Sequence, residues 1–146
     1  MSALTAAIAA RLGGDPELAS LLAGYRGGPA VFTVDPAPED AELPYIVTAG
    51  EVTQTPADTK TGRGRQVWRD VRCYAPADGS AVTVEAIAER VWILLHRQSP
   101  ALDIEGFRVT VAECSGPVAA DELDAYGRIV TVRLIMREVQ HGEEWS

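Results

Sequence analysis

The stretch at residues 129–138, IVTVRLIMRE, decides the fold, because apolar and polar side chains alternate along it for the length of a strand. Four apolar residues share one side of this predicted strand: Val130, Val132, Leu134 and Met136. Polar residues alternate with them on the other side: Thr131, Arg133 and Arg137. A period of two with one apolar face is typical of a half-buried antiparallel strand.

Two earlier stretches are also predicted to be strands. Residues 107–111 alternate in the same way, and the acidic, glycine-containing stretch 115–127 is predicted to connect them to the closing strand. Residues 65–74 are rich in strand-forming types. One face of this strand is expected in the core: Val67, Val71 and Cys73. The other face combines aromatic and charged residues, which suits a subunit contact: Trp68, Asp70, Arg72 and Tyr74.

Helical spacing of apolar residues predicts a long helix over residues 83–98, ended by Pro100. A shorter helix is predicted at residues 2–12, and a second begins after a cap at Asp15. A short strand is predicted at residues 31–34, and a second strand from residue 44 to about residue 54. The predicted fold class is therefore α+β, with a mostly antiparallel sheet, one long helix packed across a face and a short N-terminal helical pair.

The length of 146 residues fits one domain, predicted to span residues 1–146. Residues 55–64, TPADTKTGRG, have no apolar period and are predicted to form a mobile loop. The polar tail at about residues 140–146 is expected to fray.

The balance of acidic and basic residues argues against some classes of protein. The chain has 13 basic and 21 acidic residues, a net charge of −8, which argues against a general nucleic-acid coating protein. No apolar run approaches the ~20 residues of a membrane-spanning helix, and the first residues do not resemble a signal peptide. We expect a soluble protein that is made in the cytoplasm and keeps its thiols reduced.

Motifs of the common enzyme classes are missing from the sequence, including phosphate-binding glycine loops, zinc-binding helices and nucleophile elbows. Two cysteines cannot complete a tetrahedral zinc site, so Cys73 and Cys114 are expected to be buried, inert thiols. We therefore predict no catalytic residue, no metal site and no cofactor.

One basic cluster runs from the predicted loop into the strand that follows it. Its residues could contact an acidic partner surface or passing DNA, or they could serve solubility by pairing with local acids. Together with the mixed strand face, the cluster gives a candidate interaction set: Lys60, Arg63, Arg65, Trp68, Arg69, Asp70, Arg72 and Tyr74.

The order of several local phrases resembles a known family, the tail terminator or tail-completion proteins of long-tailed phages and related prophages. The phrases are ALTAAIAARLGGDPELASLL at 3–22, LPYIVT at 43–48, VWRDVRCYAP at 67–76, VEAIAERVWILLH at 84–96, ECSGP at 113–117 and AYGRIVTVRLIMR at 125–137. Residues 118–124 and the length of the 55–64 loop depart from the family's usual pattern.

The resemblance implies a structural virion protein rather than an enzyme. Such a protein forms a hexameric ring on the head-proximal end of the tail tube, ends tube polymerisation and offers the surface that joins the head. Its partners would be itself, the tail tube protein and a head-completion or neck protein, with DNA in passing and no membrane. Two alternatives stay open: another neck component, such as a head-closure or adaptor protein, and a small cytoplasmic enzyme or ligand-binding domain.

Overall fold

The computed structural model describes residues 2–58 and 62–139. Three α-helices, a short 3-10 helix and seven strands follow one another along this part of the chain. In chain order they are α1 (Ser2–Gly13), α2 (Pro16–Leu21), β1 (Gly24–Tyr25), β2 (Gly28–Pro29), β3 (Val31–Phe32), β4 (Tyr45–Pro56), β5 (Gly64–Pro76), α3 (Val82–Leu95), η1 (Ser99–Ala101), β6 (Phe107–Ala119) and β7 (Ala125–Glu138). The fold is α+β with a mostly antiparallel sheet, as the sequence predicts.

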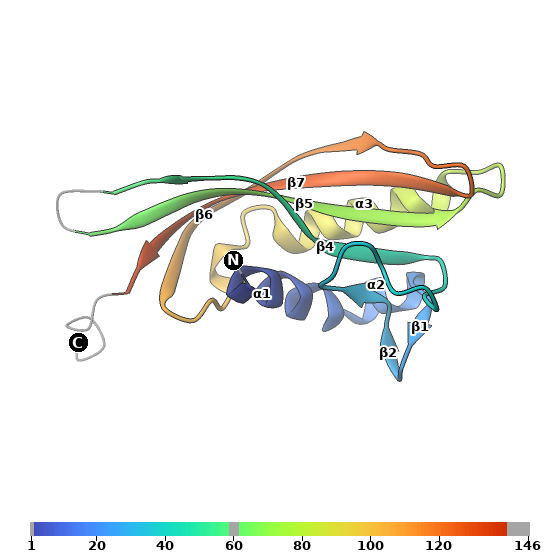
Figure 1. Cartoon of the computed structure of the whole chain (residues 1–146), viewed down its shortest axis with the longest axis horizontal. Helices are drawn as coiled ribbons and strands as arrows, with labels where there is room; N and C mark the ends of the chain where they lie inside the picture. Colours follow the sequence, from blue (N-terminus) through green and yellow to red (C-terminus); the bar gives the residue numbers. More distant parts are fainter. Residues whose placement is uncertain (1, 59–61, 140–146) are drawn as a thin grey trace.

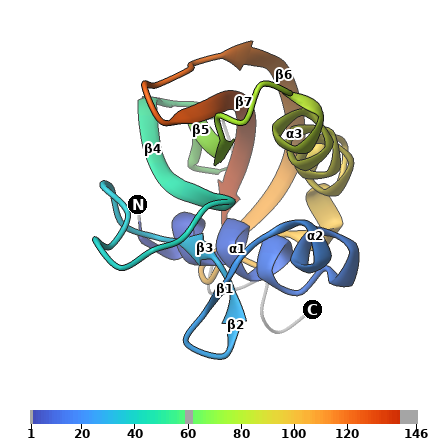
Figure 2. The same cartoon turned by 90° about the vertical axis from the view of Figure 1, so that its right-hand side faces the viewer.

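Five strands form one sheet in the order β3-β4-β5-β7-β6. The three long pairings, β4 with β5, β5 with β7 and β7 with β6, are antiparallel, and the short β3 joins β4 in parallel. The sheet is elongated and curved, and β4 and β5 extend beyond the helices as a hairpin (Figures 1 and 2). The closing strand β7 lies between β5 and β6, so both of its edges are paired.

The inner face of the sheet forms one core with all three α-helices. Val130, Val132, Leu134 and Met136 of β7 are fully buried there, which confirms the alternation seen in the sequence. The α3 helix contributes Ile87, Val91 and Leu95, and α1 contributes Leu4, Ile8 and Leu12. Figure 2 shows α1, α2 and α3 sharing the concave side of the sheet. The predicted arrangement of one long helix across the sheet therefore describes this layer only in part.

Asp15 fixes the corner between the two N-terminal helices, as the sequence predicts. Its carboxylate accepts the Leu18 N–H at the start of α2 at 2.9 Å. The same carboxylate accepts two hydrogen bonds from the Arg90 guanidinium of α3, both at 2.8 Å. The hydrogen bond from Arg90 is the main reason that the pKa of Asp15 falls to about 2. One side chain thus caps α2 and ties it to α3.

Several predicted boundaries of helices, strands and loops are wrong. The connection before β7 is much shorter than residues 115–127, because β6 continues to Ala119 by pairing with β7 through an irregular stretch at residues 115–118. The helix predicted to residue 98 ends at Leu95, with His96 as its cap. Residues 55, 56 and 64, predicted as loop, belong to β4 and β5. The β1–β2 hairpin was not predicted.

Candidate interaction surface

The outer face of the sheet carries the four residues that the sequence grouped there. Trp68, Asp70, Arg72 and Tyr74 alternate along β5 with buried residues, and each is half buried. Of the described residues, none belongs to a helix that packs on this side of β5; the α-helices share the core on the opposite face. Half burial on a face without a covering helix reflects the packing of these side chains against one another.

At one end of this face, aromatic rings pack against one another across three strands and the β1–β2 hairpin, two pairs edge to face and the third tilted. Tyr25 lies against Phe32 at 4.9 Å between ring centroids, Phe32 against Tyr45 at 5.7 Å, and Tyr45 against Tyr74 at 5.5 Å. Burial raises the pKa values of both Tyr45 and Tyr74, so both phenols are neutral at pH 7. The row gives the face a rigid apolar end.

Polar pairs cross the strands in the middle of the same face. Thr131 donates a hydrogen bond to the Asp70 carboxylate at 2.7 Å. Arg133 lies 3.6 Å from the carboxylate of Glu113 on β6, and Arg72 lies 3.9 Å from Asp35. These contacts hold charged groups in fixed positions, although ion pairs this exposed add little stability. These contacts therefore contribute little to the stability of the fold.

Three apolar residues on this face were not in the predicted interaction set. Ile129 and Ile135 of β7 are half buried beside the β5 residues. Val118 of β6 pairs with Ile129 and is 61% exposed. The signal was present in the sequence, since both isoleucines occupy outward positions of the alternating strand. The mixed face is defined from here on as Trp68, Asp70, Arg72, Tyr74, Ile129, Thr131, Arg133, Ile135, Glu113 and Val118.

Arg69 does not lie with the other predicted contact residues. It shares the core side of β5 with Val67 and Val71, is 2% exposed, and donates a hydrogen bond to the Thr5 hydroxyl of α1 at 2.6 Å. Its alternation with Trp68 and Asp70 dictates this side of the strand. Arg69 is therefore a buried link between the sheet and α1, and it is not part of a surface cluster in the folded subunit.

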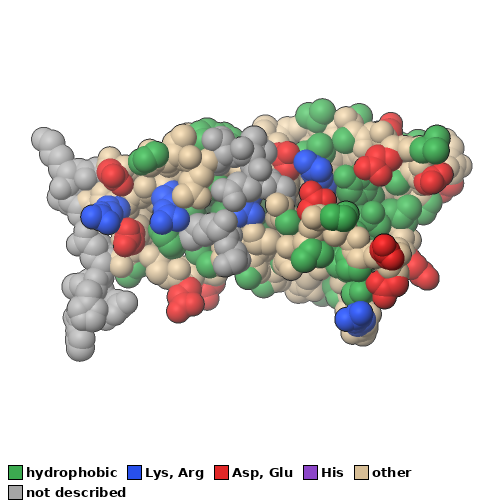
Figure 3. Space-filling model, in the orientation of Figure 1, with side chains coloured by type: hydrophobic (Ala, Val, Ile, Leu, Met, Phe, Trp, Pro, Cys, Tyr) green, Lys and Arg blue, Asp and Glu red, His purple; other side chains and the backbone are tan. Residues whose placement is uncertain are grey.

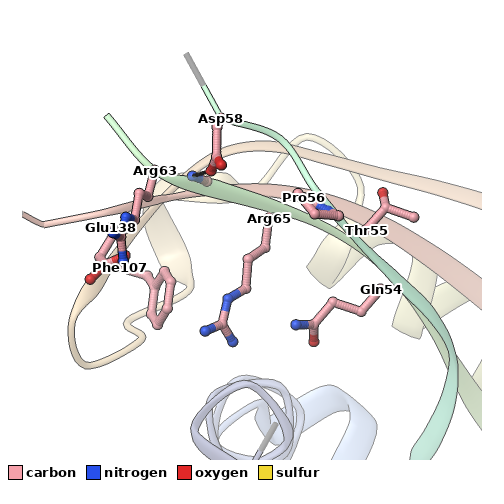
Figure 4. Close-up of a pocket in the computed structure, with 9 residues that line it drawn as sticks. Gln54, Thr55, Pro56, Asp58, Arg63, Arg65, Phe107 and Glu138 are labelled. Atoms are coloured by element: carbon pink, nitrogen blue, oxygen red, sulfur yellow. Dashed lines mark hydrogen bonds between the residues drawn. The ribbon is translucent and has the colours of Figure 1, made fainter. Parts of the chain in front are cut away.

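The other predicted basic residues separate as well. Arg63 and Arg65 lie at the far end of the β4–β5 hairpin, where they line a cavity of about 270 Å³ (Figure 4). Arg65 stacks its guanidinium on the Phe107 ring at 5.2 Å from the centroid. Lys60 lies outside the described residues. The predicted set thus divides into a hairpin pocket, the mixed face and one buried arginine.

Acidic residues gather at the opposite end of the long axis. Three connections meet there: the one between β3 and β4, the one between β5 and α3, and the one between β6 and β7 (Figure 1). Figure 3 shows their acidic side chains over that end of the molecule. All of the following are exposed: Asp35, Glu39, Asp40, Glu42, Asp78, Asp121, Glu122 and Asp124. Exposed acidic side chains of the described residues thus gather at this end.

The cysteine thiols and the possible metal-binding side chains are the groups in the described residues that could be reactive. Cys73 and Cys114 are both buried, as predicted, and burial raises the pKa of each thiol to about 12. In residues 2–58 and 62–139 no three metal-binding side chains come together. No described helix has the length and apolar character needed to cross a bilayer.

The sequence and the fold of this chain are both similar to those of known proteins. Residues 6–137 match the model of the family described as tail completion protein gp17. A chain of the virion of a native gene transfer agent (GTA) particle has a similar fold, with a TM-score of 0.74. It is 24% identical, and the match covers 93% of this chain and 96% of that chain. A search of curated proteins finds no match. Since the family match spans most of the sequence, the chain belongs to the tail completion protein gp17 family.

Proposed function

We propose that this protein is a non-enzymatic virion component that caps the head-proximal end of a phage tail tube as a ring, most simply a hexamer. The ring would stop tube polymerisation and provide the surface that joins the tail to the head. The observation that carries this proposal is the family match over residues 6–137. The similar fold of a chain in a gene transfer agent virion agrees with a place in a phage-like particle.

The mixed face is the surface that we assign to the seam between subunits. Isoleucines, a tryptophan and cross-strand ion pairs stand side by side on it without a covering helix. Interfaces between subunits combine apolar area with fixed charge pairs in this way. A closed ring uses two different patches per subunit, so the mixed face would meet another surface of its neighbour.

The distribution of charge supports a position close to DNA for a protein that does not bind DNA tightly. Tight nucleic-acid binding needs a basic footprint that releases counterions. The described surface instead concentrates acidic side chains on one end and mixes charges on the other. A ring of such subunits would let DNA pass through its lumen without retaining it.

Another neck component, such as a head-closure or adaptor protein, is the second candidate, because it would share the particle and the ring symmetry. A small enzyme or ligand-binding domain would need converging polar groups in a deep pocket. The cavity of about 270 Å³ at the hairpin holds charged residues but no nucleophile–base pair among the residues that line it. We therefore favour the tail tube over catalysis.

The test combines native mass with tube assembly. Light scattering or native mass spectrometry across a range of protein concentrations would give the oligomeric state. The tube protein from the same gene cluster would then be polymerised with and without this protein, and tube lengths would be measured by electron microscopy. We expect a ring of subunits and short, capped tubes.

Two matched substitutions separate the seam from other surfaces. Ile135→Asp places a charge on the mixed face, whereas Leu123→Asp changes an apolar residue that is 95% exposed in the β6–β7 turn. The first variant should lose the ring and the second should keep it, with both remaining folded by circular dichroism. Tubes of unchanged length in the presence of a folded wild-type protein would contradict the capping role.

A further inference from the structure

A groove of about 420 Å³ runs between α3 and the irregular stretch of β6. It lies at the edge of the sheet, because β6 is the last strand and α3 packs against it on the helix side (Figure 2). The groove therefore opens on a different side of the subunit from the mixed face. The residues that line it are Glu85, Glu89, Trp92, Gly116, Pro117 and Arg128.

Trp92 forms a fixed aromatic wall in this groove. Its ring stacks on His96 with 4.8 Å between the ring centroids and 30° between the planes. The Cys114 N–H donates to Nδ1 of His96 at 3.0 Å, which ties the stacked pair to β6. Pro117 adds an exposed apolar surface on the β6 side of the groove. The groove thus offers an apolar lining that the fold of the subunit already holds in place.

Two glutamates give the groove a negative charge. Glu85 and Glu89 stand one turn apart on α3, both exposed, and like charges at this spacing weaken a helix slightly. Arg128 lies 3.5 Å from Glu85 and 3.0 Å from Asp121, so it is shared between two carboxylates. Within residues 2–58 and 62–139, no cation forms an ion pair with Glu89. A cation that enters beside Glu89 can pair with its carboxylate and pack on the Trp92 ring.

The outer face of the sheet presents cations of this kind next to an apolar side chain. Arg133, Ile135 and Arg137 follow one another on the outer side of β7, and each is half buried. Arg133 lies 3.6 Å from Glu113, in an ion pair that is partly exposed to solvent. Arg108 of β6 is the Cα partner of Arg137 and adds another positive charge. The three arginines give the surface around Ile135 a charge opposite in sign to that of the groove.

We propose that the groove of one subunit receives Ile135 and a flanking arginine, Arg133 or Arg137, from the outer sheet face of the next subunit. This inference rests on the proposed ring and identifies the second patch of its seam, since a closed ring joins two different patches. The opposite charges of the two surfaces favour a second copy of this chain as the occupant. The guanidinium lies between Glu89 and Trp92, and the isoleucine packs against the apolar lining.

A short thiol cross-linker tests this contact in the double variant Glu85→Cys with Val111→Cys. Val111 is the Cα partner of Ile135 on the outer face, so the variant keeps the residues that make the proposed contact. The two cysteines lie on opposite sides of the sheet within one chain and can be joined only between subunits. We expect a ladder of covalent oligomers on a denaturing gel, ending at the number of subunits that native mass gives. Cys73 and Cys114 are buried and should not react.

Two controls accompany the cross-linking. Each single-cysteine variant should stay monomeric on the gel, because it carries only one side of the contact. Glu39→Cys with Val111→Cys should stay monomeric as well, since Glu39 is exposed in the connection between β3 and β4, away from the groove. The charge is tested by Glu89→Lys, which should lose the ring in native mass measurements. Glu39→Lys makes the same change of charge and should keep it, with both variants folded by circular dichroism.

The outcomes separate this contact from the proposed function. A wild-type ring whose double variant gives no ladder overturns the contact and leaves the ring intact. A covalent dimer from a single-cysteine variant also overturns it, because the same patch then meets itself. A Glu89→Lys protein that keeps the ring but no longer caps tubes would assign the groove to the tube protein instead. A ladder without capped tubes supports the contact and contradicts the capping role, whereas a wild type that stays monomeric with and without tube protein overturns both.

Discussion

Leu134→Ala tests the position of β7 in the core most directly. Leu134 is fully buried, and its backbone partners are Val67 on β5 and Ala112 on β6. Because paired strands hold the site on both sides, the surroundings cannot easily collapse into the space that the substitution leaves. Loss of a buried leucine side chain costs about 2–5 kcal/mol, and we expect about 3 kcal/mol here. The melting temperature should fall by about 6–12 °C in a domain of this size.

Ile135→Ala is the control on the same strand. Ile135 is the next residue, it faces outward between Gln66 and Val111, and it is half buried. Its truncation should lower the free energy of unfolding by about 1 kcal/mol, because less apolar area is removed from the core. Urea unfolding followed by circular dichroism, at one fixed protein concentration for all variants, gives both values. If Ile135→Ala is as damaging as Leu134→Ala, the two faces of β7 have been assigned to the wrong sides.

Two further predictions concern the N-terminal corner and a tight backbone approach. Asp15→Ala removes the α2 cap and the partner of Arg90, and should lower the free energy of unfolding by about 1–2 kcal/mol in urea titrations at pH 7. Because the folded pKa of Asp15 is about 2 against an ordinary 3.8, its stabilising effect is complete above pH 4 and is lost as the pH falls toward 2. Wild type and variant should therefore converge in acid, and a constant difference down to pH 2 would refute the pairing. Gly127→Ala should destabilise by about 1–3 kcal/mol, because a Cβ there would clash with the Ala120 carbonyl oxygen. Gly13→Ala, which meets nothing within 4 Å, should leave the melting temperature nearly unchanged in a calorimetric scan.

The local patterns of the sequence were reliable where one face of an element is buried and the other is not. The alternation at residues 129–138 correctly assigned four core residues of β7. The helical spacing after residue 83 correctly identified the buried stripe of α3. In both elements the apolar residues recur with the period of the element and one face is buried, so a short stretch of sequence is enough to identify the buried face. The cap at Asp15 is equally local, since donor and acceptor lie three residues apart.

Residue charge did not predict exposure where a distant element buries the side chain. Arg69 was grouped with nearby basic residues, although its alternation with Val67 and Val71 placed it on the core side of β5. Its burial depends on α1, whose Thr5 lies 64 residues away in sequence and accepts its hydrogen bond. The strand at 115–119 was missed for a similar reason, because Ser115, Gly116 and Pro117 show no strand pattern of their own. The stretch is extended because β7 pairs with Ser115 and Val118, on either side of Gly116 and Pro117.

The sequence by itself determined the types of the long helix and of the long strands, their apolar faces, the buried thiols and the family resemblance, because each depends on local period, on residue type or on the order of short phrases. The tertiary structure decided the strand order β3-β4-β5-β7-β6 and the division of the predicted contact residues among pocket, mixed face and core. It also decided the aromatic row from Tyr25 to Tyr74, whose rings come from separate elements. The physical reason is that such contacts join residues far apart in sequence, and strand pairing, rather than local preference, brings them together.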